Sequence, residues 1–516
     1  MPNAASALER PLDVLTATAS DLRHLLESGR HSSVDLVHAY LVQIAKHNHA
    51  GMSLHAITAT APVEKLVEDA AALDHERKTF GPRSPLHGIP ITIKDFFLSP
   101  SFGMETTCGS FALKGLNAKE DAAIATALKD AGCIIIGLAN LSEWANCKGT
   151  NLTSGWSALG GQTQSPYVVG GMDPKDRWIG HTTPGGSSSG SAVGTAAGFS
   201  AFSIGSESDG SIVQPSLRAA LYSIKGTVGD INMKGTMSGG AGFDSAGPIA
   251  KNVEDCADVM DLLLPGRGFR SHLTKSWDDI HIAYLDYQTW RFEDWICDPL
   301  PGFDNEHEAA VISALKAAEA SGAKVTYDAH LLLPKQIMKQ YNTVQMGDLL
   351  DYELAFCMER FLGLFANSTL RSIGDLVQFN KNHADLELPP HQPNQVQFEK
   401  AAASKMTQEE YESGLKHLRQ SFRDAIEKCF ESTNANVIMA SGESFLSTIS
   451  GGSGYPIASV PLGLSSFNGR PHGMLILARN GEEAKVFEVM SAWEATFPDA
   501  RQPPPQLVKW SPSSEL

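Results

Sequence analysis

Two stretches rich in glycine and serine contain the hydroxyl groups that could do chemistry in this chain. They are residues 184–191 (PGGSSSGS) and 205–212 (GSESDGSI). In the second stretch Ser211 follows Gly210, shortly after an apolar run (AFSIGS) that is typical of a strand. A tight turn after a strand can expose a hydroxyl and point successive backbone N–H groups at one position, where the oxygen of an attacked carbonyl gains negative charge. Ser211 is therefore a candidate nucleophile.

A serine hydroxyl needs a base that takes its proton, and the sequence offers two candidates. His181 is the nearest histidine, in GHTTPGG, but no G-x-S-x-G elbow contains Ser211 and a loop histidine is more often a hydrogen-bonding residue. Lys94 ends the apolar run HGIPITIK, where burial would lower its pKa and favour the neutral amine. The alternative for Lys94 is a salt bridge with the adjacent Asp95 or with another carboxylate. The sequence alone does not place Lys94 beside Ser211.

Other chemistries fit the motifs less well. The glycine-rich run is not a phosphate-binding loop, because the chain contains no G-x-x-x-x-G-K-[ST] and no G-x-G-x-x-G that opens a helix with an acidic residue after it. The seven cysteines are an odd number without C-x-x-C spacing, so we expect neither a disulfide framework nor a zinc site. We expect Cys147, which lies near the proposed site, to line a pocket.

The elements that must position these residues alternate between helix and apolar strand. Residues 119–130 (KEDAAIATALKD) predict a helix, and CIIIGLAN after them predicts a buried strand; the small-residue run SAVGTAAGF predicts a tightly packed helix before AFSIGS. This alternation predicts right-handed crossovers. The fold class expected is α/β, with a central mixed, mostly parallel β-sheet covered by helices on both faces.

The whole chain, 1–516, is expected to form one large domain. Its predicted parts are a helical N-terminal region (1–80), a catalytic core (81–265), a more variable helix-rich region (270–430), a C-terminal sheet region (431–500) and a loose tail (501–516) rich in proline and serine.

Charge and hydropathy restrict the partners. The formal net charge of −17 disfavours nucleic acid and anionic membrane surfaces, both of which attract basic proteins. The N-terminus does not have the pattern of a signal peptide, and no stretch reaches 18 apolar residues, so we expect a cytoplasmic protein that does not span a membrane. Large α/β enzymes often pair symmetrically, so a homodimer is the oligomer to consider.

The stretch 184–216 resembles the signature of the amidase-signature family. The match includes PGGSSSGSAVGTAAGF and IGSESDGSIVQPS, and the spacing of their two serines, Ser187 and Ser211, agrees with the family pattern. HGIPITIKDFF is similar to the family's strand with the catalytic lysine, and GYPIASVPLG with PHGMLILAR is similar to its C-terminal sheet. The resemblance covers nearly the whole chain and is weakest over 270–430.

The resemblance implies cleavage of a carbon–nitrogen amide bond through a Ser–Ser–Lys triad. Ser211 would form the acyl-enzyme, Ser187, next to a cis peptide bond, would relay the proton, and Lys94 would be the base. Backbone N–H groups of the turn that ends at Ser211 would form the oxyanion hole: Ser208, Asp209 and Gly210. The family uses no metal and no organic cofactor, so none is expected.

Two departures from the commonest signature suggest a subgroup. Asp209 stands where glycine is usual, and Val213 stands where an arginine is usual. An arginine there could hold a substrate carboxylate, so its absence argues against small acidic amides. The Asp-Gly form is similar to the subgroup of bacterial peptide amidase and many fungal amidases, and by this likeness Ala145 and Asn146 would line the substrate pocket. Residues 168–183 form a longer link than usual, either a loop over the site mouth or a surface insertion.

The expected substrate is a small-molecule amide of peptide-like, aliphatic or aryl type, and three alternatives remain open. An acyl transferase or cyclase on the same fold would pass the acyl group to a nucleophile other than water. A non-catalytic binding protein could use the amidase fold, although the intact triad disfavours this. An amidotransferase subunit of a tRNA-linked complex is disfavoured by the Asp-Gly signature and the lack of basic character.

Overall fold

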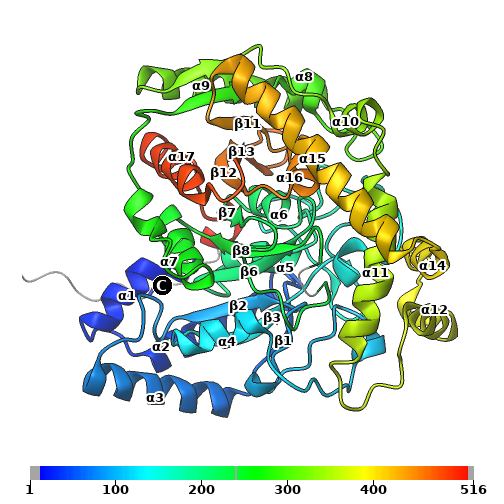
Figure 1. Cartoon of the computed structure of the whole chain (residues 1–516). Helices are drawn as coiled ribbons and strands as arrows, with labels where there is room; N and C mark the ends of the chain where they lie inside the picture. Colours follow the sequence, from blue (N-terminus) through cyan, green and yellow to red (C-terminus); the bar gives the residue numbers. More distant parts are fainter. Residues whose placement is uncertain (1–11, 239–240, 510–516) are drawn as a thin grey trace, which may run out of the picture.

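Eleven strands form one sheet through the middle of the computed structural model, which describes residues 12–238 and 241–509 (Figure 1). Two further short strands pair beside it, β4 (Trp156–Ser157) with β5 (Gly161–Gln162). In spatial order the large sheet consists of β1 (Ile57–Thr60), β3 (Ile134–Ala139), β2 (Pro90–Lys94), β6 (Phe202–Glu207), β8 (Ser245–Ala250), β7 (Tyr222–Lys225), β12 (Ile457–Leu464), β13 (Pro471–Leu477), β11 (Val437–Ser441), β9 (His281–Tyr284) and β10 (Lys324–Thr326).

The sheet is mixed, as predicted, but it is not mostly parallel. Within the described chain, β2–β3, β2–β6, β9–β11 and β9–β10 are the parallel pairs, and the other neighbours run antiparallel. The connection from β12 to β13 shows why. Only residues 465–470 join these strands, and so short a link cannot cross back to start a parallel strand. Helix and strand alternate, with parallel pairing, from β2 to β6 and again at β9, β10 and β11, whereas β8, β7, β12 and β13 pair antiparallel.

Helices cover both faces of the sheet (Figure 1). On one side α7 contacts both α4 and α17, and α17 contacts α9; on the other α5 contacts α6, and α16 contacts α15. The helices of the described chain are α1 (Ala19–Glu27), α2 (Ser33–His47), α3 (Val63–Phe80), α4 (Ala123–Asp130), α5 (Ser189–Ala196), α6 (Val213–Leu217), α7 (Val253–Leu263), α8 (Tyr287–Trp290), α9 (Pro301–Ala320), α10 (Pro334–Gln340), α11 (Met346–Leu362), α12 (Ile373–Asn382), α13 (Ala384–Glu387), α14 (Val396–Ala403), α15 (Gln408–Thr433), α16 (Leu446–Ser453), α17 (Glu483–Thr496) and α18 (Pro505–Val508).

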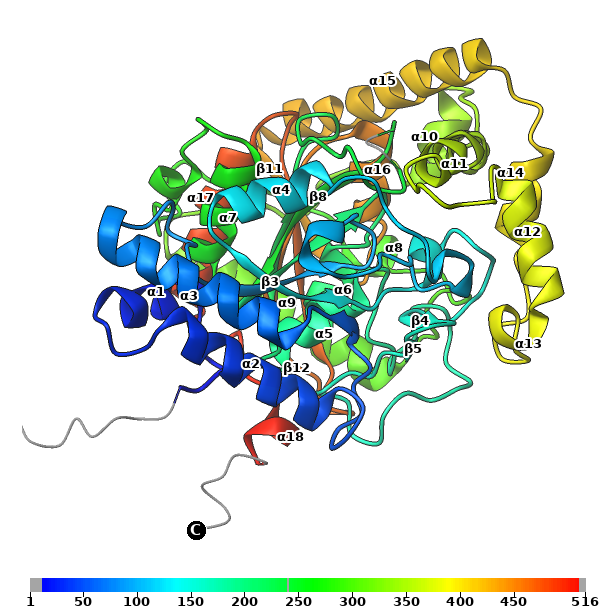
Figure 2. The same cartoon turned by 90° about the horizontal axis from the view of Figure 1, so that it is seen from below.

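The helix-rich region predicted over 270–430 lies largely beside the sheet. Figure 2 shows α12, α13 and α14 at the edge of the molecule, with α11 between them and the body. The contacts agree, because α11 touches α12, α14 and α15. This region therefore adds a side wall to the core and few strands to its sheet.

The start of the predicted loose tail is folded against the body, which corrects that prediction for residues 501–509. Leu507 in α18 is buried, Arg501 donates a hydrogen bond to the carbonyl oxygen of Leu15, and the Tyr167 hydroxyl donates to that of Gln502. These contacts join distant parts of the chain, so the proline-rich composition does not reveal them. The rest of the predicted tail, 510–516, lies outside the described residues.

Two further properties follow from the described residues. None of their helices has both the length and the apolar character that crossing a membrane requires. All seven cysteines are free thiols, and no cluster of three or more histidine, cysteine, aspartate or glutamate side chains within 12–238 and 241–509 could bind a metal ion.

Candidate active site

Two neighbouring parallel strands position the Lys94 amine. Strands β2 and β6 are parallel neighbours, so Lys94 at the end of β2 lies beside the turn that follows β6. The Lys94 amine, fully buried, is 2.7 Å from the Ser187 hydroxyl oxygen. It also donates to the Ser206 hydroxyl at 3.1 Å and the Ser206 carbonyl at 3.3 Å. All three acceptors are uncharged.

Ser187 is held by the backbone on both sides. A cis peptide bond joins Gly186 to Ser187. The Ser187 carbonyl accepts a hydrogen bond from the Ser142 N–H at 3.0 Å, and the next residue, Ser188, donates its N–H to the Ser211 carbonyl at 3.1 Å. The segment with Ser187 is thus attached directly to the turn with Ser211.

Burial without a countercharge changes the protonation of Lys94. Loss of hydration lowers the pKa of its amine to about 8, while the negative charge of Asp244 is the largest opposing influence. The neighbouring Asp95 does not pair with it, because the Asp95 carboxylate accepts hydrogen bonds from the Thr107 N–H, the Thr107 hydroxyl and the Thr58 hydroxyl. No carboxylate of the described chain forms an ion pair with Lys94, so the salt-bridge alternative is wrong. With a pKa of about 8, roughly a tenth of the amine is neutral at pH 7.

The turn from β6 to α6 is fixed by carboxylates at its corners. Glu207 accepts the N–H groups of Ile212 and Val213, at 2.6 and 2.9 Å, which anchors the start of α6. Gly210 has φ +80°, a left-handed conformation that glycine adopts without steric cost. Asp209 accepts hydrogen bonds from two hydroxyls of α16, Ser447 at 2.7 Å and Thr448 at 2.8 Å.

Backbone N–H groups of this turn are left without acceptors. Within the described chain no atom accepts a hydrogen bond from the N–H of Ser208, Asp209, Gly210 or Ser211. The Ser208 hydroxyl donates to the Asp244 carboxylate, so its side chain is occupied while its N–H is not. An oxygen that becomes negative near this turn would find free donors.

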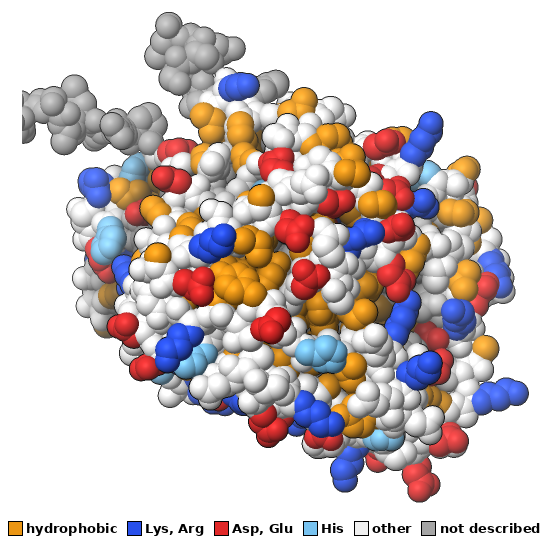
Figure 3. All heavy atoms as spheres, turned by 90° about the horizontal axis from the view of Figure 1, so that it is seen from above, with side chains coloured by type: hydrophobic (Ala, Val, Ile, Leu, Met, Phe, Trp, Pro, Cys, Tyr) orange, Lys and Arg blue, Asp and Glu red, His pale blue; other side chains and the backbone are white. Residues whose placement is uncertain are grey.

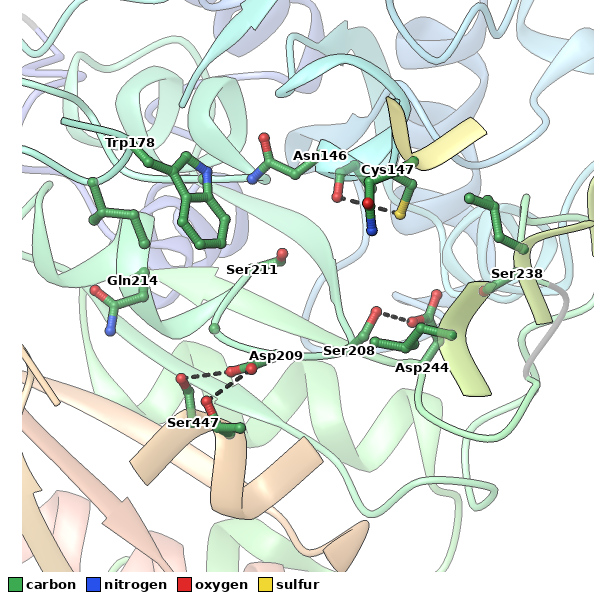
Figure 4. Close-up of a pocket in the computed structure, with 18 of the residues that line it drawn as sticks. Asn146, Cys147, Trp178, Ser208, Asp209, Ser211, Gln214, Ser238, Asp244 and Ser447 are labelled. Carbon is green, nitrogen blue, oxygen red and sulfur yellow. Dashed lines mark hydrogen bonds between the residues drawn. The ribbon is translucent and has the colours of Figure 1, made fainter. Parts of the chain in front are cut away.

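A cavity of about 420 Å³ opens above the turn. Ser211 projects into it between Trp178 and Gln214 on one side and Asp244 on the other (Figure 4). Lys94 and Ser187 do not line the cavity and lie beneath its floor. The lining residues are Phe96, Ala145, Asn146, Cys147, Trp178, Ile179, Gly186, Ser208, Asp209, Gly210, Ser211, Gln214, Met237, Ser238, Asp244, Phe292, Trp295, Ile296, Leu350, Asp351, Glu353, Leu354, Cys357, Gln397, Phe445, Ser447 and Thr448.

Ala145 and Asn146 line the cavity on a segment of unusual backbone. Trp144, Ala145 and Asn146 have φ values of 52°, 56° and 70°, in the left-handed region that non-glycine residues rarely adopt. Buried anchors hold the segment: the Trp144 side chain is fully buried, and Glu143 forms an ion pair with Lys148 at 2.6 Å. Such a conformation persists where the surroundings enforce it, which is common at binding sites.

The long link over 168–183 reaches the cavity at its far end. Trp178 and Ile179 line it, and the Trp178 ring stacks on that of Trp295 with centroids 5.9 Å apart. Val169, near the start of the link, is exposed instead. His181 is turned away and its ring is 2.8 Å from the carbonyl oxygen of Asp298. The link is thus part of the wall of the site.

Sequence reasoning missed most of the cavity walls. Cys147 lines the cavity as predicted, but the residues from 290–297 and from α11 carried no motif that could have identified them. The sequence showed only that these residues belong to the helix-rich region over 270–430. Trp144 and Trp156 are buried and do not line the cavity.

Other proteins share this fold and match this sequence. The family model described as Amidase matches residues 35–487. A probable amidase of Arabidopsis thaliana is 29% identical over 96% of this chain and 93% of its own length. The structure of peptide amidase from Stenotrophomonas maltophilia superposes with a TM-score of 0.82, at 29% identity, covering 96% of this chain and 99% of that one. An amidase family protein from Bacillus anthracis gives a TM-score of 0.81 at 25% identity, covering 95% and 92%.

The chain therefore belongs to the amidase family, and it is an amide-hydrolysing enzyme. The family model spans the signature stretch, the strand with Lys94 and the C-terminal sheet region.

Proposed function

We propose that this enzyme cleaves a carbon–nitrogen amide bond through an acyl-enzyme on Ser211, with Ser187 as relay and Lys94 as base. The observation that carries the proposal is the buried Lys94 amine, 2.7 Å from the Ser187 hydroxyl and without a carboxylate partner in the described chain. A neutral amine in this position can accept a proton, which an ion-paired ammonium could not.

The reaction proceeds in two steps, acylation and deacylation, which use the same proton path. Neutral Lys94 takes the Ser187 proton while Ser187 takes the Ser211 proton, and the Ser211 oxygen attacks the amide carbonyl. The N–H groups of Asp209 and Gly210 would stabilise the resulting oxyanion. The C–N bond then breaks as the proton returns through Ser187 to the leaving nitrogen, and a free amine departs. Water attacks the ester by the same path, which releases the carboxylic acid and restores Ser211.

The substrate class that we propose is a peptide-like, aliphatic or aryl amide. Similarity to peptide amidase supports it, and so does the apolar wall formed by Trp178, Phe292 and Trp295. The partner is thus a small molecule, and we expect the catalytic machinery to be made of protein groups alone. A homodimer remains the proposed oligomer.

Labelling with a serine-reactive fluorophosphonate tests the nucleophile. We expect one modified peptide, containing Ser211, and no labelling of Ser211→Ala. Ser459→Ala is the matched control, since it removes a buried hydroxyl that pairs with Ser223 between β7 and β12, away from the cavity. Modification at another serine in the folded protein would remove Ser211 from the mechanism.

Product analysis distinguishes hydrolysis from acyl transfer. Each turnover should release one carboxylic acid and one amine, with or without an added amine nucleophile. Diversion of most of the acyl group to the added amine, at concentrations where water competes, would favour the transferase alternative. A folded protein that binds amides without turnover would favour the non-catalytic one.

A further inference from the structure

The ionisable groups of the cavity wall all have the same sign. Among the described residues that line the cavity, the ionisable acids and bases are Asp209, Asp244, Asp351 and Glu353, with no lysine, arginine or histidine. The face in Figure 3 differs, because acidic and basic side chains are interspersed on it. The cavity, unlike that face, has acidic side chains without basic ones among its described lining residues.

Some of these carboxylates are satisfied by the protein and others are not. Asp209 is occupied by the two hydroxyls of α16. Asp244 is only 8% exposed, and one of its oxygens accepts from Ser208 while the other has no hydrogen-bond donor in the described chain. Glu353 is 6% exposed, and its carboxyl accepts from the Tyr411 hydroxyl at 2.8 Å and interacts with the Phe243 backbone N–H. These donors are uncharged, so the described part of the protein places no cation directly on the carboxylates at this end of the cavity.

Nearby cations do not neutralise this end of the cavity. Asp351 accepts only a long hydrogen bond, 3.4 Å, from Gln397. Lys400 and Arg419 exert some attraction on Asp351 and Glu353, respectively, but neither forms an ion pair within 4 Å of these carboxylates in the part of the chain described. Arg419 donates instead to the carbonyl oxygen of Gly242.

The opposite end of the cavity differs in character. The stacked rings of Trp178 and Trp295 lie there with Phe292 and Ile296, in an apolar wall. Gln214 belongs to this end (Figure 4); its Nε2 donates to the Gly442 carbonyl at 2.7 Å, while its buried Oε1 has no partner among the described residues. A substrate N–H that reached this wall would satisfy the Gln214 oxygen.

We propose that the enzyme selects amides that carry a positive charge, with an ammonium group at Asp351 and Glu353 and an aromatic or apolar group against Trp178 and Trp295. This inference rests on the proposed function, because it places the scissile amide at Ser211 between the two ends. An ammonium provides several N–H donors for the carboxyl oxygens of Asp351 and Glu353, and its charge is attracted in a partly dehydrated cavity. The same charges disfavour anionic substrates.

The protonation of Glu353 agrees with this assignment. Burial, together with the negative charge of Asp244, raises the pKa of the Glu353 carboxyl to about 8, against the smaller opposing effects of Tyr411 and Arg419. With this pKa the Glu353 carboxyl is largely protonated near neutral pH. A substrate ammonium beside it would lower that pKa and favour the ionised carboxylate.

Matched substrates test the selection. Dipeptide amides with lysine, norleucine or glutamate on the acyl side form one series, and amides whose leaving amine carries an ammonium, a methyl group or a carboxylate form the other. In at least one series we expect kcat/KM to be about tenfold higher for the cation than for its neutral counterpart, and lowest for the anion. Equal or lower kcat/KM for the cation in both series would overturn the proposal.

Variants test which residues cause the preference for cationic amides. Asp351→Asn and Glu353→Gln should each reduce the cation-to-neutral ratio of kcat/KM toward 1. Asp348→Asn is the matched control, because it removes the same charge from the exposed side of α11 and should keep the ratio of the unchanged enzyme. A ratio that survives both cavity substitutions would overturn the assignment to α11.

The same experiments distinguish failure of the charge selection from failure of the proposed function. If neutral amides are hydrolysed through Ser211 without preference for cations, only the charge selection fails. If no amide in either series is hydrolysed and fluorophosphonate does not label Ser211, the proposed function fails with it.

Discussion

The floor and the walls of the cavity are built in different ways. The floor is the turn with Ser211, and Lys94 and Ser187 lie directly beneath it; the Lys94 amine contacts the Ser187 hydroxyl, and a backbone hydrogen bond joins Ser188 to Ser211. The walls come from the 168–183 link, residues 290–297 and α11, which are far apart in the chain and meet mainly through side chains. The difference indicates that the chemistry depends on a small rigid unit, while selectivity depends on segments that can change without disturbing it.

The largest effect should come from removing Ser211, the proposed nucleophile. We expect Ser211→Ala to lower kcat by at least about 10⁴-fold, because members of a catalytic unit are not individually replaceable. Steady-state kinetics with circular dichroism of the variant would measure this. A folded variant with a near-normal rate would contradict the role of Ser211, and Ser459→Ala should retain the rate of the unchanged enzyme.

Removal of Lys94, the proposed base, should lower kcat nearly as much. Lys94→Ala removes the proton acceptor, so we expect a fall in kcat of about 10³- to 10⁴-fold. Lys94→Arg should be similarly inactive, because a guanidinium remains charged at any pH where the protein is folded. Substantial activity of the arginine variant would show that no neutral base is needed at this position.

The pH profile should follow the burial of Lys94. Because the amine must be neutral and its pKa is about 8, kcat/KM should rise about tenfold for each pH unit below 8 and level off above it. The sign is fixed, since deprotonation increases with pH. A flat or falling profile between pH 6 and pH 8 would contradict Lys94 as the base.

The smallest effect should come from a substitution in the aromatic wall of the cavity. Trp178→Ala removes one ring of the pair with Trp295, so kcat/KM for aromatic amides should fall about three- to tenfold relative to small aliphatic ones. Phe80→Ala is a suitable control, because this side chain on α3 is 83% exposed. An equal loss for both classes of amide would indicate a general structural effect and not selection by the wall.

The sequence predicted the floor better than the walls. The strand ending at Lys94, the helix from Ser189 and the strand before Ser211 are all present. Their patterns are local, so they can be recognised without knowing the rest of the fold. Asp351 and Glu353 are ordinary helix residues by sequence, and only the packing of α11 beside the core places them in the cavity.

Two predictions about the fold were wrong for the same reason. The sheet is less parallel than expected, because β12 and β13 are joined by a short link. Residues 501–509 are folded because Arg501 donates to the carbonyl of Leu15, Gln506 donates to that of Val168, and Leu507 is buried. Both features depend on contacts between segments distant in sequence. Composition and periodicity do not encode such contacts directly.

The sequence by itself determined the order and spacing of the serines, the lysine at a strand end and the turn that presents Ser211, because strand, turn and glycine conformations are governed by neighbouring residues. Only the tertiary structure decided that Lys94 is dehydrated beside Ser187 and that unneutralised carboxylates face aromatic rings across the cavity. Dehydration and juxtaposition arise from packing between distant segments, and these in turn set the pKa of the amine and the charge of the cavity.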